Sequence, residues 1–293
     1  MPGYYAYGLG IRSELPLPAL RARKIKPDVV IRFAKRVCKT DALGQAGSSI
    51  RECGEEVCLQ WKGAGRFHIR GGREITIERE AGAEEGILRV LLLGPALAVL
   101  LHQRGLLILH GSAILLQGAV VAFLGQKGIG KSTTAAKLHE RGHPVVADDV
   151  IAVQMITGAP FAFPAYPQLN LWPDAASALG HNLSAVPKLH SRVEKRATHA
   201  TKGFSANPLP LRLLYVLGRG TRNTATDLSP HEALTELLRH SYAAKLIRGS
   251  AAPIHFRQCA SLVGAVRMRR LEVRPALSDL PAVARLIEED TTR

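Results

Sequence analysis

Two patterns of hydrophobic and polar positions divide the chain. From residue 4 to residue 80, short apolar runs alternate with turn residues, and in the last run Ile75 and Ile77 alternate with polar neighbours. A period of two is typical of a strand with one buried face. The runs are Val29–Phe33, Val57–Trp61, Arg66–Arg70 and Glu74–Glu78. This pattern predicts a small strand-rich N-terminal module.

A longer apolar stretch follows, from residue 87 to residue 103, and Gly105 ends it. Its most hydrophobic part, Ile87–Leu101, contains Arg89 and Pro95. It is shorter than the roughly 20 apolar residues that a membrane-spanning helix needs. We therefore expect a buried helix that connects two parts of the chain, and no membrane partner.

From Leu106 onward, apolar strand-like runs alternate with helical runs, which is typical of an α/β sheet domain. We predict a helix at Lys131–Arg141 and strands at Leu106–Leu109, Ala113–Gln117, Ala119–Leu124, Val145–Val146 and Val150–Met155. Domains usually have about 100 to 200 residues, so a chain of 293 residues is expected to have two. We place a strand-rich domain with its connecting helix at 1–103 and the α/β domain at 104–293.

Charge and composition narrow the possible partners. Lys and Arg number 39 against 24 Asp and Glu, a formal net charge of +15, which favours acidic partners such as nucleotides or acidic peptides. Aromatic residues make up only 5% of the chain, whereas nucleic-acid readers often interleave them with basic residues, so nucleic acid is not expected. The 4 cysteines form no close framework and no secretory signal precedes them, so we expect reduced thiols in a cytoplasmic protein.

The candidate chemistry is concentrated in one motif, which fits G-x-x-x-x-G-K-[ST] at every position. Its residues are Gly125, Gln126, Lys127, Gly128, Ile129, Gly130, Lys131 and Ser132, and Thr133 follows. An apolar strand precedes the motif and a helix-forming run follows it, which is the context that separates a phosphate-binding loop from a chance glycine turn. We expect residues 125–133 to hold the phosphates of a nucleotide.

Each residue type in this loop has a physical role. The glycines allow positive φ values, so backbone N–H groups can surround phosphate oxygens. Lys131 can reach the β and γ phosphates, and the Ser132 hydroxyl can ligate Mg²⁺. The helix that starts here directs the positive end of its dipole at the same anion.

Two adjacent carboxylates, Asp148 and Asp149, follow a short strand that begins after Pro144. We expect them at the C-terminal end of that strand, where ligands bind in open α/β sheets. One could hold magnesium and the other could take or position the proton of an attacking hydroxyl; alternatively, one of them only caps the next element. His110 ends an apolar run and is, by itself, more typical of a structural histidine than of a catalyst.

The segment 187–210 is rich in basic residues and poor in apolar ones, so we expect a mobile basic loop there. Within it, Arg192, Lys195 and Arg196 are expected to contact the nucleotide or an acidic acceptor. A solvated surface run is the simpler alternative for each of them.

The order of these features resembles the catalytic domain of HPr serine kinase/phosphorylase, a family of bacterial protein kinases. The strong similarity covers residues 106–151 and consists of His110-Gly111, the phosphate loop, Arg141-Gly142-His143 and Val146-Ala147-Asp148-Asp149. The resemblance implies that the loop binds ATP and Mg²⁺ through Lys131 and Ser132. It also implies that Asp148 is the base acting on a serine hydroxyl, Asp149 a metal-associated carboxylate and His110 an accessory residue. Because the family forms hexamers, a homo-oligomer is a further expectation.

Two departures from that family bear on activity. A glutamate follows the loop serine in the family, where this chain has Thr133, and the Arg-Gly-Leu-Gly type segment associated with phosphorolysis has no counterpart after residue 160. The reverse, phosphorylase reaction is therefore not expected. The chain instead resembles the HPr-kinase-like proteins found with lasso peptide biosynthesis enzymes, in the segments Tyr4–Leu9, Ser13–Pro18, Gly94–Ser112 and Pro167–Trp172. That resemblance implies a serine of a ribosomal precursor peptide as the acceptor.

The sequence thus predicts an α/β, HPr kinase/PEP carboxykinase-like P-loop domain behind a small strand-rich domain. The predicted activity is that of an ATP-dependent kinase for a serine in a peptide or small protein. The alternatives are a nucleotide-binding regulatory protein and an HPr-type kinase without a role in peptide tailoring. The combination of Asp148, Asp149 and His110 favours a kinase, because a pure sensor does not need it.

Overall fold

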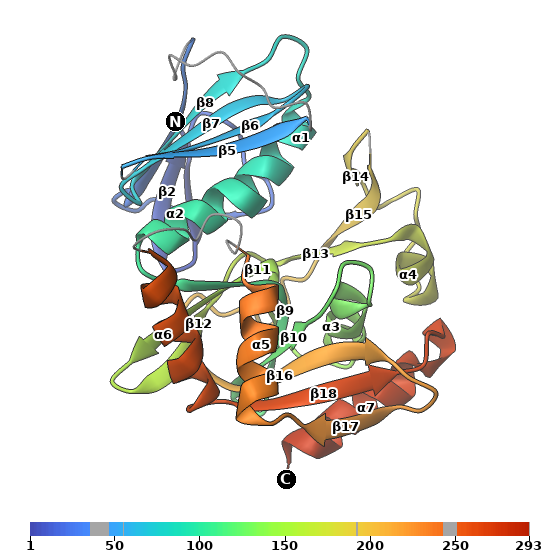
Figure 1. The fold of residues 1–293 in the computed structure, drawn as a ribbon. Helices are drawn as coiled ribbons and strands as arrows, with labels where there is room; N and C mark the ends of the chain where they lie inside the picture. The colour runs from blue at the N-terminus through green and yellow to red at the C-terminus, as the bar shows by residue number, and fades with distance from the viewer. Residues whose placement is uncertain (36–46, 55, 192, 243–250, 293) are drawn as a thin grey trace.

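The computed structural model describes residues 1–35, 47–54, 56–191, 193–242 and 251–292. An eight-stranded sheet lies in the N-terminal part, in the order β3-β1-β2-β4-β8-β7-β6-β5 (Figure 1). Its strands are β1 (Gly3–Ala6), β2 (Leu9–Ser13), β3 (Arg21–Ala22), β4 (Val29–Phe33), β5 (Ser48–Cys53), β6 (Glu56–Trp61), β7 (Gly65–Arg70) and β8 (Glu74–Arg79). The four predicted runs coincide with β4, β6, β7 and β8, so the prediction of a strand-rich N-terminal region is confirmed.

The alternation in these strands buries one face of the sheet. Ile75 and Ile77 of β8 are fully buried, and Ile69 and Phe67 of β7 lie directly opposite them. Such cross-strand apolar pairs are a main source of sheet stability. A helical run packs on this sheet, formed by α1 (Glu85–Leu91), the π-helical turn η1 (Leu92–Ala96) and α2 (Leu97–Gln103).

The predicted buried helix is therefore present, with a π-helical turn in its middle. Pro95 lies in that turn and has no backbone N–H to donate, which interrupts the regular hydrogen-bond ladder. By length and composition alone, the run Glu85–Gln103 could cross a membrane, but 56% of its most apolar window is buried inside the protein. Leu88, Leu97 and Leu101 are fully buried in the same hydrophobic cluster as the first sheet, as in a core helix.

The second sheet has seven strands, in the order β10-β9-β11-β12-β16-β18-β17. They are β9 (Leu107–Leu116), β10 (Ala119–Leu124), β11 (Val145–Ile156), β12 (Ala159–Phe163), β16 (Leu209–Arg219), β17 (Thr224–Asp227) and β18 (Arg267–Val273). β10 also pairs in parallel with β16, so it has a neighbour on both edges. Every residue of β10 is buried, which explains why its sequence reads as an uninterrupted apolar run.

Helices cover both faces of this sheet. Val120, Ala122 and Leu124 of β10 belong to the large cluster that includes α5 (Pro230–His240) and α6 (Ala251–Val263), and that also continues into the first sheet. Val121 and Phe123 point the other way, into a second cluster with α3 (Lys131–Glu140) and α7 (Leu280–Thr291). The two groups of helices are seen at opposite sides of the strands in Figure 1. The predicted α/β class is confirmed, and the predicted helix after the motif is α3.

Two predictions about this sheet are wrong. The runs before and after residues 110–112 are one strand, β9, and the runs before and after Asp148 and Asp149 are one strand, β11. The carboxylates therefore lie inside a long strand, not at its C-terminal end. Polar residues inside these strands resembled turns in the sequence, but the two strands pair with each other across them.

The segment 187–210 is not the loop that its composition predicted. It contains β14 (Lys188–His190) and β15 (Val193–His199), and β15 pairs with β13 (Gln168–Leu171) to form a three-stranded sheet. The sheet projects beside α3 and the short helix α4 (Pro173–Ala178) in Figure 1. Because β15 is mostly half-buried, it lacks the apolar run that would have identified it.

The pairing of β9 with its neighbours depends on a glycine. A Cβ atom on Gly111 would lie 2.4 Å from the carbonyl oxygen of Phe123 in β10. We expect Gly111→Ala to lower the free energy of unfolding by about 1–3 kcal/mol, because backbone must move to admit the methyl group. Gly218→Ala in β16 is the matched control, since its Cβ would meet only Glu272, at 4.0 Å. Urea denaturation measures both, and equal stabilities of the two variants would contradict the close approach.

Candidate active site

The phosphate loop connects the buried strand β10 to helix α3. Gly125, Gly128 and Gly130 have φ values of 141°, 82° and 109°, which residues with side chains rarely adopt. A Cβ on Gly128 or Gly130 would meet nothing within 4 Å, so there the backbone conformation, and not space, requires glycine. Gly130 is the N-cap of α3 and offers no capping side chain, so the first N–H groups of the helix are available to an anion.

Lys131 is bent back over the start of this loop. Its ammonium donates hydrogen bonds to the carbonyl oxygens of Gly125, at 2.9 Å, and Gln126, at 3.0 Å. Only 7% of Lys131 is exposed, and burial lowers its pKa, while the nearby Asp149 and Asp148 act in the opposite direction. The ammonium group is thus held at the point where the loop leaves β10.

Strand register brings the carboxylates to the same point. Leu124, the last residue of β10, pairs with Gly111 of β9, and Gly111 pairs on its other side with Asp149 of β11. The loop therefore begins two strands away from Asp149, at the same level of the sheet. Asp149 can therefore lie beside the loop although it is inside β11 and the strand continues for several residues beyond it.

Asp148 lies at the centre of a buried hydrogen-bond network. Its Oδ1 accepts from the hydroxyls of Ser132, at 2.8 Å, and Ser112, at 2.7 Å, and its Oδ2 accepts from the backbone N–H of Asn170, at 2.8 Å. Only 2% of Asp148 is exposed. Burial, together with the charge of Asp149, raises the pKa of Asp148 to about 6 even though these hydrogen bonds lower it.

Asp149 faces the cavity instead. Its Oδ2 accepts from the side-chain amide of Asn170, at 3.0 Å, and it lines the hollow in front of the phosphate loop. Its φ of 68° is uncommon for a residue with a side chain, and aspartate tolerates it better than most. Backbone strain of this kind clusters at functional sites.

His110 contacts the backbone of Asp149. Its Nδ1 donates to the carbonyl oxygen of Asp149, at 3.0 Å, which leaves Nε2 without a proton in the neutral ring. Burial and the charge of Lys131 lower the pKa of His110, so the neutral form is favoured. The ring of Tyr242 packs edge-on, with 5.6 Å between the ring centroids.

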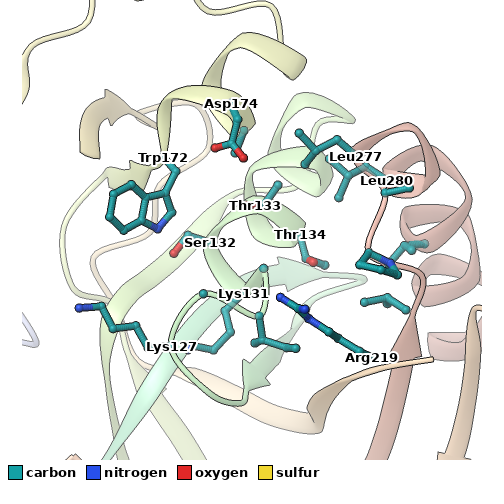
Figure 2. A pocket seen from close by; sticks show the side chains of 18 of the residues that line it. Lys127, Lys131, Ser132, Thr133, Thr134, Trp172, Asp174, Arg219, Leu277 and Leu280 are labelled. Atoms are coloured by element: carbon teal, nitrogen blue, oxygen red, sulfur yellow. The ribbon is translucent and has the colours of Figure 1, made fainter. Parts of the chain in front are cut away.

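A hollow of 510 Å³ lies in front of the loop and is lined by residues of several elements. Figure 2 shows Ser132, Thr133 and Thr134 in its middle, Trp172 and Asp174 at one side, and Arg219, Leu277 and Leu280 at the other. Three residues of the site, Ser112, Asn170 and Arg219, were not predicted from the sequence. Ser112 could have been noticed as the neighbour of His110-Gly111, whereas Asn170 and Arg219 reach the site only through tertiary structure.

Of the three basic residues predicted to contact a ligand, the structure describes two, and only one of these two lines the hollow. Lys195 lines the hollow, and its Nζ lies 5.9 Å from the centroid of the Trp172 ring. Arg196, the next residue of β15, donates to the carbonyl oxygen of Val186 instead, because successive side chains of a strand point to opposite faces. Arg192 lies outside the described residues.

Comparison with known proteins identifies the segment that carries this geometry. Residues 105–162 match the family model of the HPr Serine kinase C-terminal domain. This segment of the chain is similar to HPr kinases. It is 46% identical over 48 residues to the HPr kinase/phosphorylase of Caldanaerobacter subterraneus subsp. tengcongensis. It is 42% identical over 50 residues to that of Treponema pallidum strain Nichols. The predicted resemblance to HPr kinases is thus confirmed.

The extent of these matches limits what they show. The two alignments cover 16% and 17% of this chain and 16% of each relative. A solved structure, the Hpr(Ser) kinase/phosphatase from Coxiella burnetii, aligns over 63% of this chain and 96% of its own, with 13% identity and a TM-score of 0.35. At that score the structural likeness supports no argument.

Because the pKa of Asp148 is raised, the stability of the ligand-free protein should depend on pH. Between pH about 4 and 6, the folded state binds a proton that the unfolded carboxyl group has already lost. The free energy of unfolding should therefore rise as the pH falls from 7.5 to 5, by roughly 1 kcal/mol for each pH unit below about 6. Asp148→Asn should lack this rise.

Denaturant titrations of both proteins at several pH values, in EDTA and without nucleotide, measure the effect. The relevant quantity is the difference between wild type and variant, because other titrating groups cancel in it. A difference that is constant from pH 7.5 to 5 would show that Asp148 keeps an ordinary pKa in the folded state.

Proposed function

We propose that this protein is an ATP-dependent kinase that phosphorylates a serine of a peptide or small protein. The observation that carries the proposal is the combination of three groups at one place. The ammonium of Lys131 and the hydroxyl of Ser132 lie at the phosphate loop, two adjacent carboxylates lie next to them, and neutral His110 borders the same cavity. A protein that only binds a nucleotide does not need the second carboxylate and the histidine.

The residues present fit a magnesium-bound nucleotide. The glycine-rich loop and the uncapped start of α3 offer backbone N–H groups to the phosphates, and Lys131 adds a positive charge that can move from its carbonyl partners to a phosphate oxygen. Mg²⁺ favours oxygen ligands and usually combines one or two carboxylates with phosphate oxygens, as the pair Ser132 and Asp148 would allow. When bound, Mg²⁺ would neutralise charge that develops on the transferred phosphoryl group.

The contacts support a division of labour between the two carboxylates that differs from the one implied by the family resemblance. Asp148 is buried and holds the Ser132 hydroxyl, so we assign it to the metal. Asp149 faces the cavity beside His110, so we assign it to the acceptor. In this scheme the acceptor oxygen bonds to the γ phosphorus, the bond to the β-phosphate oxygen breaks, and Asp149 takes the hydroxyl proton.

We extend the proposal to the kind of acceptor. The segments Tyr4–Leu9, Ser13–Pro18 and Pro167–Trp172 resemble HPr-kinase-like proteins found with lasso peptide biosynthesis enzymes, and this supports a ribosomal precursor peptide as the substrate. The HPr protein remains the alternative acceptor, because the relatives of the phosphate-loop segment bear the name HPr kinase/phosphorylase.

The experiment that tests the function is incubation with ATP, Mg²⁺ and candidate acceptors, followed by mass spectrometry. A kinase adds one phosphoryl group to a serine of one acceptor and releases an equal amount of ADP. ADP release with no labelled acceptor across precursor peptides and HPr would instead favour a nucleotide-hydrolysing regulatory protein. Labelling of HPr alone would keep the kinase assignment and remove the precursor peptide from it.

Replacement of Asp148 should affect nucleotide binding, whereas replacement of Asp149 should affect the transfer step. Asp148→Asn should weaken Mg²⁺-dependent nucleotide binding, and added Mg²⁺ should recover part of it, because a charge beside the metal is lost. Asp149→Asn should bind Mg²⁺ and ATP almost as wild type does, yet transfer the phosphoryl group about 10² to 10⁴ times more slowly. Calorimetric titration and single-turnover kinetics separate the two effects. The opposite pattern would restore Asp148 as the base.

Lys131 should be essential for nucleotide binding but not for folding. We expect Lys131→Ala to abolish nucleotide-dependent activity with little change in melting temperature, because its ammonium contacts two loop carbonyls and not the hydrophobic core. Lys137→Ala is the matched control, since Lys137 lies on the same helix and pairs with Glu140 at the surface. Full activity of Lys131→Ala, or a loss shared by Lys137→Ala, would count against the phosphate loop as the binding site.

A further inference from the structure

A second hollow adjoins the one in front of the phosphate loop. Its volume is 490 Å³, and its lining includes Gln126 and Lys127 of the loop together with Arg239, His240 and Tyr242 from the end of α5 and the residues after it. The two hollows share His110 and Lys127. They therefore meet at the start of the phosphate loop.

That meeting point is where a phosphoryl group would be transferred. The Nζ of Lys131 lies against the carbonyls of Gly125 and Gln126, and both of these residues line the second hollow. A lysine at this loop position reaches the β and γ phosphates, while the backbone of the loop and helix α3 hold the phosphates nearer the nucleoside. The γ-phosphate end of a nucleotide in the first hollow would thus point at the second.

The geometry of phosphoryl transfer indicates where the nucleotide and the acceptor would bind. In phosphoryl transfer the attacking and leaving oxygens lie roughly in line, on opposite sides of the phosphorus. A nucleotide that fills the first hollow leaves the second as the approach for the acceptor. His110 stands between them, with its Nδ1 fixed on the carbonyl of Asp149.

The charged side chains that line the second hollow are positive. Lys127 is exposed, and the side chain of Arg239 is 59% exposed. None of the described residues that line this hollow is acidic, whereas Asp149 and Asp174 line the first. The carboxylate nearest to Arg239 is the buried Glu236, at 3.2 Å.

Glu236 does not neutralise Arg239 fully, because it is shared. Its Oε1 also lies 3.3 Å from the guanidinium of Arg270, and its Oε2 lies 3.3 Å from Nε2 of His240. Two guanidinium groups thus face one carboxylate, and Lys127, which also lines the hollow, adds a further positive charge. A ligand with a negative side chain would complete this arrangement.

We propose that the second hollow is the acceptor groove, and that it selects polypeptide segments with an acidic side chain close to the phosphorylated serine. The proposal rests on the kinase function proposed above. A segment of chain fits the site better than a small anion does, because its hydroxyl must reach Asp149, next to His110 where the two hollows meet, while its acidic side chain meets Arg239. Tyr242, which is half-buried, lines the same hollow against the ring of His110 and offers an apolar surface to the peptide.

Three sets of synthetic peptides test the groove in the full-length protein. Each peptide has a central serine in a degenerate background, flanked by Glu, by Gln or by Lys. Incorporation of labelled phosphate from ATP with Mg²⁺ should be about 5- to 10-fold higher for the Glu set than for the Gln set, and lowest for the Lys set. The preference should weaken at high salt, because Lys127 and Arg239 are exposed.

Two arginine variants locate the selectivity. Arg239→Gln should bring the Glu-to-Gln ratio close to one, and Arg239→Lys should restore part of it. Arg267→Gln is the matched control, because Arg267 pairs with Asp227 at the surface and does not line this hollow, so the ratio should persist. An equal loss in both arginine variants would mean that the overall positive charge of the protein, and not the groove, sets the preference.

The possible results distinguish the acidic acceptor groove from the kinase function on which it rests. Equal labelling of the three sets by the wild-type protein would overturn the acidic groove and leave the kinase assignment standing. Labelling of no peptide, by a protein that still binds ATP and Mg²⁺, would count against the kinase assignment and the groove together. A preference that survives in Arg239→Gln would place acceptor recognition elsewhere.

Discussion

The close approach of β9 and β10 at Gly111 is the constraint on which the site depends. The register of the three adjacent strands places Leu124, Gly111 and Asp149 at one level, and the missing side chain of Gly111 allows the carbonyl oxygen of Phe123 to approach closely there. The phosphate loop leaves the sheet at that level, so its lysine and serine reach carboxylates from a strand two positions away. A bulkier residue at position 111 would push β10 and its loop away from β11. The loop residues Lys131 and Ser132 would then lie farther from the carboxylates of Asp148 and Asp149.

This arrangement concentrates like charges, which has an electrostatic cost. Asp148 and Asp149 are adjacent, and Asp148 is almost completely buried, so its pKa rises despite three hydrogen bonds to it. Lys131 supplies one positive charge nearby, but its own pKa is lowered by burial. The carboxylate oxygens and the ammonium are therefore under-compensated until a cation and an anion arrive together. A magnesium–nucleotide complex has this composition, and its binding would relieve both deficits at once.

The sequence predicted those features that local patterns determine. The phosphate loop follows from the types of eight consecutive residues, and β10 and α3 on either side of it follow from apolar runs and helix formers. The extent of β9 and β11 could not be predicted, because the polar residues that build the site interrupt their apolar pattern. Asn170 and Arg219 were missed for a different reason. Each lies far along the chain from the loop. Arg219 reaches the site through the pairing of β16 with β10, and Asn170 through its hydrogen bonds to Asp148 and Asp149, and no local pattern encodes either contact.

The first sheet is also connected to the site, although no residue of it lines the hollow. Tyr7 is buried, and its hydroxyl donates to the carbonyl oxygen of Val150, the residue after Asp149. Its backbone N–H donates to Pro164, just beyond β12, at 2.8 Å. Tyr7 thus bridges β11 and the segment after the neighbouring strand, on the side of the sheet away from the loop. An aspartate with a φ of 68° needs surroundings that hold its strand in place, and the N-terminal sheet provides one of these supports. The N-terminal strands therefore belong to the structural basis of the site and are more than an appended module.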